Sequence, residues 1–487
     1  MKINNLIANI EAIFVRVPED FVVAGIEDDS RAVSEGFVFV AVKGNLVDGH
    51  DYIKQAIVQG AKGVIFEDNA ALSQIPDNRA AIKVKDSRKA LAEIATLFYK
   101  EPAKKLKSTA ITGTNGKTTV SYLIEGILKN AGKKPGIIGT VNMRFNDTII
   151  STQNTTPGQL TLQRVMARMV EAGVEYLVME VSSHALAQGR IEGIDFYSAI
   201  FTNFTQDHLD YHKDMESYFK AKAVLFEGLS KNSFAILNAD DPVSVKLAAL
   251  TKAKVITYAV NAKADVSCQD LVFSSTSTEF TLHFRGESLL LKTKLIGRYN
   301  VSNILAASAW ALVSGIAPKI LAQAVESFKT VPGRLQSIEL GNDFGIFVDF
   351  AHTDDALANV LSTLREITLR RLIVVFGCGG DRDKLKRPKM GRVATDLADY
   401  VIITNDNPRS ESSEAIASDI TGGILLKNYK VILDRRKAIQ EALAMAEKGD
   451  ILLIAGKGHE SYQVIGKDKI DFNDSQVVKE CLASAKS

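Results

Sequence analysis

A glycine-rich segment followed by a lysine and two threonines has the composition of a phosphate-binding loop. Its residues are Gly113, Thr114, Asn115, Gly116, Lys117, Thr118 and Thr119. Glycines let backbone N–H groups point at phosphate oxygens, and a following helix N-terminus adds a favourable dipole. Lys117 would bridge the β- and γ-phosphates, and the Thr118 hydroxyl would bind Mg²⁺. Ile111 occupies the position of the first glycine in the longer pattern. A structural glycine turn is therefore the alternative, but the Lys-Thr-Thr triplet favours nucleotide binding.

A second group of chemically capable residues follows two apolar runs further along the chain. Glu180 ends the run YLVME, and two histidines and two aspartates lie within residues 207–212, after AIFTNF. A carboxylate at a strand end beside a phosphate loop can hold Mg²⁺. Four such side chains in six positions favour a site over isolated surface residues. Magnesium prefers oxygen ligands, so Glu180 is a stronger candidate than His208.

Composition excludes several classes of protein. Lys plus Arg is 59 and Asp plus Glu is 57 in 487 residues, which gives a net charge of +2. A nucleic-acid binder needs a large positive excess on one face, so we expect no nucleic-acid partner. Three dispersed cysteines, with no membrane-length apolar run and no secretory leader pattern, predict a cytoplasmic protein without membrane insertion.

Short apolar runs alternate with helical patterns along most of the chain. The expected strands in the first half are 37–42, 63–67, 80–84, 108–112, 176–181, 198–203 and 233–237. The expected helices with the clearest periodicity are 51–60, 87–100, 118–132 and 300–315. Strands separated by helices predict parallel pairing in a doubly wound sheet. Residues 255–296 alternate at period two, which predicts antiparallel hairpins.

These patterns predict an α/β protein of three domains. A polar stretch at 101–107 and the segment VPGRLQ at 331–336 are the candidate boundaries. We therefore expect an α/β domain at 1–104 and a central doubly wound parallel sheet with an antiparallel subsheet at 105–330. A Rossmann-like domain is expected at 331–487. Arg382 stands where the third glycine of a dinucleotide fingerprint would be, so NAD binding is not expected.

The segment TGTNGKTT resembles the phosphate loop of the Mur ligases and the folylpolyglutamate synthetases, and further matches extend over nearly the whole chain. The resemblance implies an ATP-dependent ligase in which a carboxylate attacks the γ-phosphate and an amine then captures the acyl phosphate, releasing ADP and phosphate. It implies a catalytic role for Lys117 and magnesium bound by Thr118, Glu180 and His208. The segment SYFKAKAVLF resembles the one whose lysine is carbamylated, which implies that Lys222, rather than Lys220, is N6-carboxylysine.

The same resemblance implies ATP contacts outside the phosphate loop. Asn303 lies in GRYNVSN and is expected near the adenine, and a helix N-cap at Asn300 is a second reading of that segment. Arg334 in VPGRLQ and Asp349 in VDFAHTDDAL resemble further nucleotide contacts. Asp354 stands where the family usually has Pro, and both residue types suit a helix start.

Two further segments resemble sites for a UDP-muramoyl dipeptide, as in the family members that add the third residue of the peptide. The implied uridine contacts in the first domain are Ser30, Asn45, Leu46 and Val47. The implied contacts to the muramoyl peptide are Asn154, Thr155, Thr156, Ser182, Gln188 and Arg190. Arg190 could pair with a substrate carboxylate through two parallel hydrogen bonds.

A third segment bears on the amino acid that is added. Asp406, Asn407, Pro408 and Arg409 form the sequence DNPR, which resembles the family members that add meso-2,6-diaminopimelate; lysine-adding members usually lack the arginine. Diaminopimelate is lysine with an extra carboxylate, which a guanidinium can bind through two hydrogen bonds. By resemblance, Arg382, Gly456 and Glu460 complete the site, with Glu460 on the distal ammonium.

The sequence therefore predicts a magnesium-dependent, ATP-consuming ligase of peptidoglycan-precursor synthesis whose partners are small-molecule substrates, and which we expect to be a monomer. Two alternatives remain. One is the L-lysine-adding activity of the same family, since pocket changes can bypass a single arginine. The other is a nucleotide-gated switch that binds ATP without ligation.

Overall fold

The computed structural model describes residues 1–44, 47–152, 154–274, 277–338 and 340–486. Contacts divide the chain into two compact units. Unit 1 comprises residues 1–110 and 133–197, and unit 2 comprises residues 111–132 and 198–487. The first boundary between the units falls within strand β6 (Lys107–Thr112), between residues 110 and 111. The three-domain boundaries at 104/105 and 330/331 stay a prediction.

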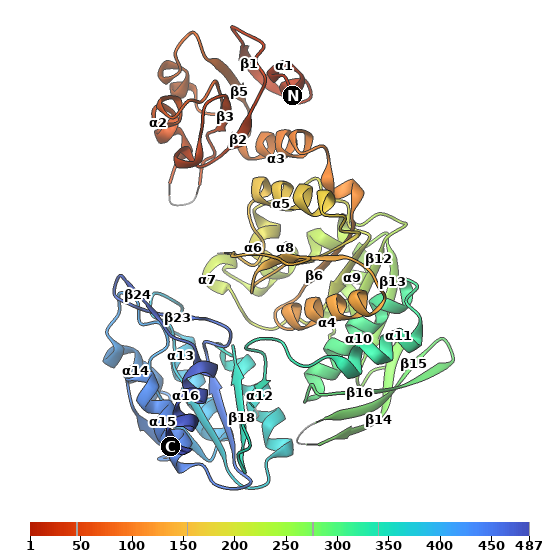
Figure 1. Cartoon of the computed structure of the whole chain (residues 1–487), viewed down its shortest axis with the longest axis vertical. Helices are drawn as coiled ribbons and strands as arrows, with labels where there is room; N and C mark the ends of the chain where they lie inside the picture. Colours follow the sequence, from red (N-terminus) through yellow and green to blue (C-terminus); the bar gives the residue numbers. More distant parts are fainter. Residues whose placement is uncertain (45–46, 153, 275–276, 339, 487) are drawn as a thin grey trace. The chain divides into compact units, whose positions relative to one another are not determined.

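Unit 1 begins with a five-stranded sheet in the order β1-β5-β4-β3-β2 (Figure 1). Strands β2 to β5 pair in parallel, and β1 pairs antiparallel with β5. Its helices and strands are α1 (Ile3–Ile7), β1 (Ala12–Arg16), β2 (Gly25–Glu27), η1 (Ser30–Ala32), β3 (Phe37–Val40), η2 (Gly49–Tyr52), α2 (Ile53–Val58), β4 (Gly63–Phe66), η3 (Asn69–Gln74), β5 (Ala80–Val84), α3 (Ser87–Phe98) and η4 (Pro102–Lys105). The expected strands at 37–42, 63–67 and 80–84 are confirmed to within two residues.

The rest of unit 1 contains the strand that ends at Glu180 and the strands beside it. Strand β10 pairs in parallel with β7, and β7, β8 and β9 form an antiparallel meander. These elements are β7 (Pro135–Ile138), β8 (Met143–Phe145), β9 (Thr148–Ile150), α5 (Gln159–Glu171), β10 (Tyr176–Glu180) and α6 (Ser183–Ala187). Glu180 is the last residue of a strand whose other four side chains are apolar or aromatic, so the strand end fixes its position.

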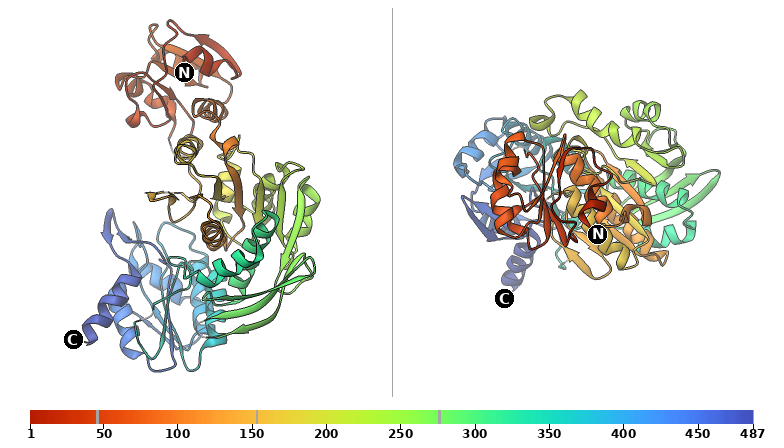
Figure 2. Two further views of the ribbon diagram at one scale, coloured as in Figure 1. Left: turned by 45° about the vertical axis from the view of Figure 1, so that its right-hand side comes forward. Right: turned by 90° about the horizontal axis from the view of Figure 1, so that it is seen from above.

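Unit 2 contains the phosphate loop, the helix α4 that follows it, and a sheet in which β11, β12, β13 and β14 pair in parallel. Strands β14, β15 and β16 continue this sheet as antiparallel hairpins (Figure 2), as the period-two pattern predicted. The prediction is wrong for the start of 255–296, where β13 pairs in parallel with β12 and β14. The elements are α4 (Lys117–Asn130), β11 (Ser198–Phe201), α7 (Leu209–His212), α8 (Met215–Glu227), β12 (Phe234–Asn238), α9 (Val243–Leu250), β13 (Lys254–Ala259), β14 (Val266–Phe273), β15 (Thr278–Phe284), β16 (Glu287–Thr293), α10 (Arg298–Val313) and α11 (Pro318–Ser327).

The last part of unit 2 is a second sheet in the order β17-β18-β22-β19-β20-β21, parallel except for β17. Helices α12, α13 and α14 pack on one face, and α15 and α16 pack on the other (Figure 1). The elements are β17 (Gln336–Ser337), β18 (Gly345–Asp349), α12 (Asp354–Ile367), β19 (Leu372–Phe376), α13 (Lys386–Leu397), β20 (Tyr400–Ile403), α14 (Ser413–Thr421), β21 (Tyr429–Val431), α15 (Arg435–Met445), β22 (Ile451–Ala455), β23 (Tyr462–Ile465), β24 (Asp468–Asp471) and α16 (Asp474–Lys486). Both faces of the central strands are covered, which explains their continuous apolar runs.

Candidate functional site

The phosphate loop connects β6 to α4, and its two glycines are required by close contacts. A side chain at Gly113 would place its Cβ 1.9 Å from Thr202 Oγ1, and one at Gly116 would meet Asn303 Oδ1 at 2.5 Å. Both glycines also have positive φ angles, of 146° and 87°. Non-glycine residues adopt such angles only with strain, so a turn of this shape requires glycine.

Residues at the end of β11 hold the phosphate loop in place. The Asn203 side-chain oxygen accepts from Asn115 N at 2.8 Å, and Thr114 N donates to the Asn203 carbonyl at 2.9 Å. Thr202 Oγ1 donates to the Asn115 carbonyl at 2.5 Å. The sequence analysis did not single out Thr202 and Asn203, although both stand directly after a predicted strand. Lys117 Nζ donates to the carbonyls of Gly113 and Thr114.

Lys222 lies inside unit 2 and is linked to the phosphate loop through an aromatic ring. Tyr218 Oη is 3.2 Å from Thr114 Oγ1, and Lys222 Nζ lies 4.4 Å from the centre of the Tyr218 ring. Lys222 is 2% exposed, whereas Lys220 on the same helix is exposed and pairs with Glu216. Burial, and then the charge of Lys117, lower the pKa of Lys222 well below its ordinary value, against the opposing charge of Asp207.

Asp207 and His208 precede helix α7. His208 adopts a left-handed backbone conformation, with φ 55°, and its Nε2 lies 3.4 Å from Asp207 Oδ2. Burial acts against the charged form of Asp207, but the charges of His208 and His352 outweigh it and lower its pKa. The Nδ1–H of His352 donates to the Phe350 carbonyl oxygen at 2.9 Å, and burial lowers the pKa of His352. An ionised aspartate therefore lies among imidazoles in the same unit as the phosphate loop.

Arg334 reaches the phosphate loop, and Asp349 holds the segment that carries Arg334. Arg334 Nη2 lies 3.5 Å from Thr118 Oγ1. Asp349 is 6% exposed, and its two oxygens accept from the backbone N–H groups of Leu335 and Ala351 at 2.6 and 2.7 Å. Burial raises the pKa of Asp349, against the opposing charge of Arg334. Its observed contacts position a loop, and a contact to nucleotide stays a prediction.

Helix α10 corrects one expectation about its start. Asn300 is not an N-cap, because the helix begins at Arg298 and Asn300 lies inside it with Nδ2 on the Ile296 carbonyl. Gly297 precedes the helix instead, since a Cβ there would lie 2.3 Å from Thr363. Asn303 packs against Gly116 of the phosphate loop, and its place at the adenine stays a prediction. Helix α12 begins at Asp354 as expected, with Thr353 as its cap.

Within unit 1, hydrogen bonds connect Glu180 to residues expected to bind the muramoyl peptide. The Thr140 hydroxyl donates to Glu180 Oε2 at 2.7 Å and lies 3.1 Å from Thr155 Oγ1. Thr156 Oγ1 donates to the Glu180 carbonyl and accepts from Ser182 N. Thr140, which the sequence analysis did not single out, therefore joins the carboxylate to the expected peptide site.

Arg190 completes the same network. It donates to the Thr156 carbonyl at 2.7 Å and to Gln188 Oε1 at 2.7 and 3.0 Å. Asn154 is exposed, and its backbone N–H bonds to Thr152 Oγ1. The structure therefore brings five of the six expected muramoyl-peptide residues together and leaves Asn154 at the surface.

The expected uridine residues border a cavity of about 530 Å³ in the N-terminal sheet of unit 1. Ser30 and Val47 both line it, together with Phe39, Tyr52 and Gln55. Ser30 is buried, and its hydroxyl donates to Gln55 Oε1 at 3.0 Å. The predictions for Asn45 and Leu46 fall outside the described residues.

The expected amino-acid residues in unit 2 gather at the carboxyl ends of β20 and β22. Asn407 Nδ2 donates to Glu460 Oε2 at 2.9 Å, and buried Lys457 donates to both of these side chains. A Cβ at Gly456 would lie 2.7 Å from Asp406 Oδ2, so Gly456 leaves room for that carboxylate. Burial raises the pKa of Asp406, against the charges of Arg435 and Lys457.

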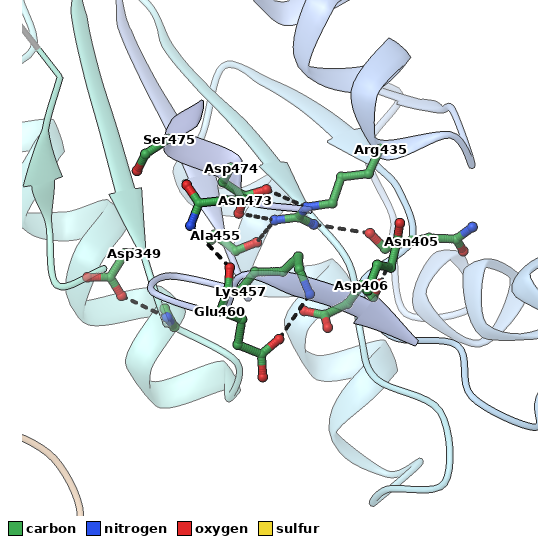
Figure 3. Close-up of polar contacts among 12 residues, drawn as sticks. Asp349, Asn405, Asp406, Arg435, Ala455, Lys457, Glu460, Asn473, Asp474 and Ser475 are labelled. Atoms are coloured by element: carbon green, nitrogen blue, oxygen red, sulfur yellow. Dashed lines mark hydrogen bonds and ion pairs between the residues drawn. The ribbon is translucent and has the colours of Figure 1, made fainter. Parts of the chain in front are cut away.

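A buried ion pair lies beneath these residues (Figure 3). Arg435 pairs with Asp474 at 2.7 Å, and neither side chain is exposed. The same guanidinium donates to the carbonyls of Asn405 and Ala455 at 3.1 and 3.0 Å. These carbonyls immediately precede Asp406 and Gly456, so the ion pair fixes the two strand ends that carry them.

Arg382 and Arg409 lie beside each other at the other end of this group. A Cβ at Gly379 would have Arg409 Nη1 at 3.0 Å and Arg382 Cγ at 3.8 Å. Arg409 donates to the Gly380 carbonyl and Arg382 to the Asp381 carbonyl. Within the described residues neither guanidinium forms an ion pair with a carboxylate, unlike Arg387 and Arg435 nearby. Two adjacent guanidinium groups without a carboxylate partner form a site for an anion.

Two features are absent from the described ranges. No group of three or more His, Cys, Asp or Glu side chains is arranged to hold a metal ion. Among the helices within those ranges, none has both the length and the apolar composition needed to cross a membrane.

Comparison with known proteins places this geometry in a family. Residues 22–99 match the family described as Mur ligase family, catalytic domain; residues 111–311 match the Mur ligase middle domain; residues 333–458 match the Mur ligase, glutamate ligase domain. The chain belongs to the Mur ligase family. Mur ligases are ATP-dependent ligases, so the ligase class expected from the phosphate loop is confirmed.

Curated Mur ligases resemble the chain over nearly its full length. A Bacillus cereus protein named UDP-N-acetylmuramoyl-L-alanyl-D-glutamate–2,6-diaminopimelate ligase is 44% identical, over 99% of this chain and 98% of the relative. A Geobacillus thermodenitrificans protein of the same name is 43% identical, over 98% and 99% of the two chains. A solved structure of a ligase with this name has a TM-score of 0.70 at 32% identity, covering 100% of this chain and 99% of that one. The Thermotoga maritima MurF ligase in complex with ADP shares the fold, with a TM-score of 0.67 at 20% identity over 96% and 98% of the chains.

Proposed function

We propose that this Mur ligase uses ATP to join 2,6-diaminopimelate to UDP-N-acetylmuramoyl-L-alanyl-D-glutamate in peptidoglycan-precursor synthesis. The observation that carries the proposal is the pair Arg382 and Arg409, which lie beside each other and form no ion pair with a carboxylate among the described residues. Arg409 follows Asn407 by two positions, and the Asn407 side chain donates to Glu460. A diamino dicarboxylic acid has carboxylate groups that can bind the guanidinium groups and ammonium groups that can bind the acidic and amide side chains. The relatives named for this reaction, at 43–44% identity, support the same assignment.

The reaction consists of two substitutions. An oxygen of the substrate carboxylate attacks the γ-phosphorus of ATP, the bond between the β,γ-bridging oxygen and that phosphorus breaks, and ADP leaves. The uncharged amine of the amino acid then attacks the acyl carbon, phosphate leaves, and the nitrogen loses a proton. Lys117 and the backbone N–H groups of the phosphate loop would neutralise charge on the transferring phosphoryl group.

Magnesium is part of the proposal because the phosphoryl oxygens need charge neutralisation when they react. Thr118 and His208, both in unit 2, would hold it. Thr118 suits the role, because its side chain is buried at the phosphate loop and carries a hydroxyl oxygen, and magnesium prefers oxygen ligands. When bound, the ion would draw negative charge from the phosphate oxygens. The few acidic side chains near the loop fit an ion held partly by the nucleotide itself.

The surroundings of Lys222 support the proposal that it is carbamylated. Burial and Lys117 lower its pKa, so its amine is largely uncharged at a lower pH than that of an ordinary lysine. An uncharged amine adds to CO₂ and releases a proton, which leaves an anionic carbamate in place of the neutral amine. That anion would lie near Lys117 and would compensate its charge.

We also propose a cytoplasmic protein that acts as a monomer on small molecules. Three free cysteines, at 268, 378 and 481, support a reducing compartment. Each substrate has a candidate site in this chain, without a partner subunit.

The proposal is tested by incubating the purified protein with ATP, magnesium, the UDP-muramoyl dipeptide and one amino acid at a time. We expect ADP and a tripeptide product with diaminopimelate, and far less product with L-lysine. Preferred use of lysine would assign the lysine-adding activity instead. ATP binding with hydrolysis that no amine accelerates would identify a nucleotide-gated switch.

A further inference from the structure

A buried arginine outside the expected amino-acid site connects the two loops that carry Arg382 and Arg409. Arg387, on the first turn of α13, is fully buried. Its guanidinium forms two hydrogen bonds to Glu411, at 2.8 and 2.9 Å, and one to Asp419 at 2.8 Å. It also donates to the Gly379 carbonyl at 3.2 Å. The arginine therefore binds one loop through a carbonyl and the other through a carboxylate.

Glu411 itself contacts the Gly379–Arg382 loop. The Asp381 backbone N–H donates to Glu411 Oε1 at 2.6 Å, and Lys384 Nζ lies 3.1 Å from Glu411 Oε2. The guanidinium of Arg387 is the largest influence lowering the pKa of Glu411, to about 2. The Glu411 carboxylate therefore stays ionised at neutral pH, and it accepts hydrogen bonds from the Arg387 guanidinium and the Asp381 backbone N–H at the same time.

The two loops approach too closely to shift independently. Gly380 N donates to the Asn407 carbonyl at 2.9 Å, and Arg409 Nη1 donates to the Gly380 carbonyl at 2.6 Å. A Cβ at Gly380 would lie 1.9 Å from the Pro408 carbonyl oxygen. Movement of the Gly379–Arg382 loop would therefore displace the Gly380 carbonyl that accepts from the Arg409 guanidinium.

The backbone of Arg409 is fixed from a second direction. Its φ is 52°, which is an unfavourable conformation for a residue with a Cβ. Arg409 N donates to the Val464 carbonyl at 3.1 Å, and Gly466 N donates to the Arg409 carbonyl at 2.8 Å. The hairpin of β23 and β24 thus holds the main chain, while the Gly379–Arg382 loop holds the side chain.

We propose that Glu411 and Arg387 are positioning residues that hold Arg409 and Arg382 ready for the second carboxylate of the amino acid, and that they thereby set the preference for diaminopimelate over lysine. This inference rests on the proposed function. Neither residue needs to touch the substrate. Their effect arises because a guanidinium already held in its binding position loses little conformational freedom when the carboxylate arrives.

The charges of this region support the same role. Arg382, Lys384, Arg387 and Arg409 are four cations near the two loops. Glu411 and Asp419 pair with Arg387, and Glu411 also pairs with Lys384. Lys384 and Arg387 therefore have carboxylate partners, whereas Arg382 and Arg409, which we expect to meet the substrate, have none among the described residues.

The test is Glu411→Gln, which keeps the side-chain shape and leaves Arg387 its bond to Asp419. We expect KM for diaminopimelate to rise at least about tenfold, with KM for ATP and kcat within about twofold of the parent. kcat/KM for L-lysine should stay unchanged, because lysine lacks the second carboxylate. The matched control is Asp450→Asn, which removes the carboxylate that pairs with Arg371 at 2.6 Å in the same unit, away from these loops. The control should leave KM for diaminopimelate unchanged.

An equal loss with diaminopimelate and lysine would overturn the inference, as would an unchanged KM for diaminopimelate. If Glu411→Gln does not fold, Arg387→Lys, which keeps the charge but not the paired hydrogen bonds, is measured in the same way with the same criteria. A parent enzyme that adds lysine in preference to diaminopimelate would refute the proposed function itself. That failure is visible before any variant is made, so the two are distinguishable.

Discussion

Replacement of Arg409 by Ala should damage recognition of the amino acid and leave the nucleotide site intact. The Arg409 guanidinium has one hydrogen bond, to the Gly380 carbonyl, and no carboxylate partner among the described side chains. Alanine also carries a Cβ, so the strain of the 52° φ angle is the same in both proteins. The difference between the parent and Arg409→Ala therefore measures the contribution of the guanidinium alone.

The size of the effect follows from the contact that is lost. A hydrogen bond to a charged group contributes about 1.5–3 kcal/mol, and 1.4 kcal/mol corresponds to a factor of ten. We therefore expect kcat/KM for diaminopimelate to fall by roughly 10- to 150-fold. The loss should appear mainly in KM, because the carboxylate is bound equally in the ground state and the transition state.

The assay is ADP release with varied diaminopimelate at saturating ATP and UDP-muramoyl dipeptide, repeated with L-lysine. KM for ATP should stay within about twofold, since the phosphate loop is untouched. Arg409→Lys is a useful companion because it keeps the charge and loses the second hydrogen bond, so it should show an intermediate loss. Parallel losses for diaminopimelate and lysine would refute the carboxylate-binding role.

Three further changes probe the site. Lys117→Ala should abolish ligation while circular dichroism and the melting temperature show a retained fold, because the cation at the transferring phosphate is removed; surviving turnover would contradict the phosphate-loop interpretation. Lys222→Ala should lower kcat at least about tenfold, with partial recovery on adding a short-chain carboxylate that replaces the carbamate; recovery by a neutral amide as well would argue against an anion there. For His459, burial lowers the pKa to about 4, so between pH 6.5 and 4 the unfolded chain binds a proton that the folded chain does not, and acidification destabilises the fold. Between pH 7.5 and 5.5, the free energy of unfolding measured in urea should therefore fall by about 1 kcal/mol less in His459→Gln than in the parent. An identical fall in the two proteins would refute the lowered pKa of His459.

Local patterns anticipated most elements and several sites. The phosphate loop was evident because glycines, a lysine and hydroxyls must be contiguous to surround a phosphate. The hairpins of β14 to β16 and the helix starting at Asp354 followed from periodicity and capping chemistry, whereas β13, at the start of the predicted hairpin stretch, is a parallel strand. The N-cap at Asn300 was wrong, because α10 begins at Arg298, directly after Gly297. A Cβ at Gly297 would clash with Thr363, which is 66 positions away in the sequence, so this constraint is not visible locally.

The sequence by itself determined the order of strands and helices, the phosphate-binding turn and the residue types able to meet a carboxylate. These depend on neighbours within a few positions, and local sterics and periodicity act over that range. Only the tertiary structure decided which of two nearby lysines is buried, which arginines pair with carboxylates, and which carboxylates accept from backbone N–H groups. Desolvation and ion pairing depend on groups brought together from distant positions, such as Arg435 with Asp474 and Arg387 with Glu411, and spacing along the chain does not encode them.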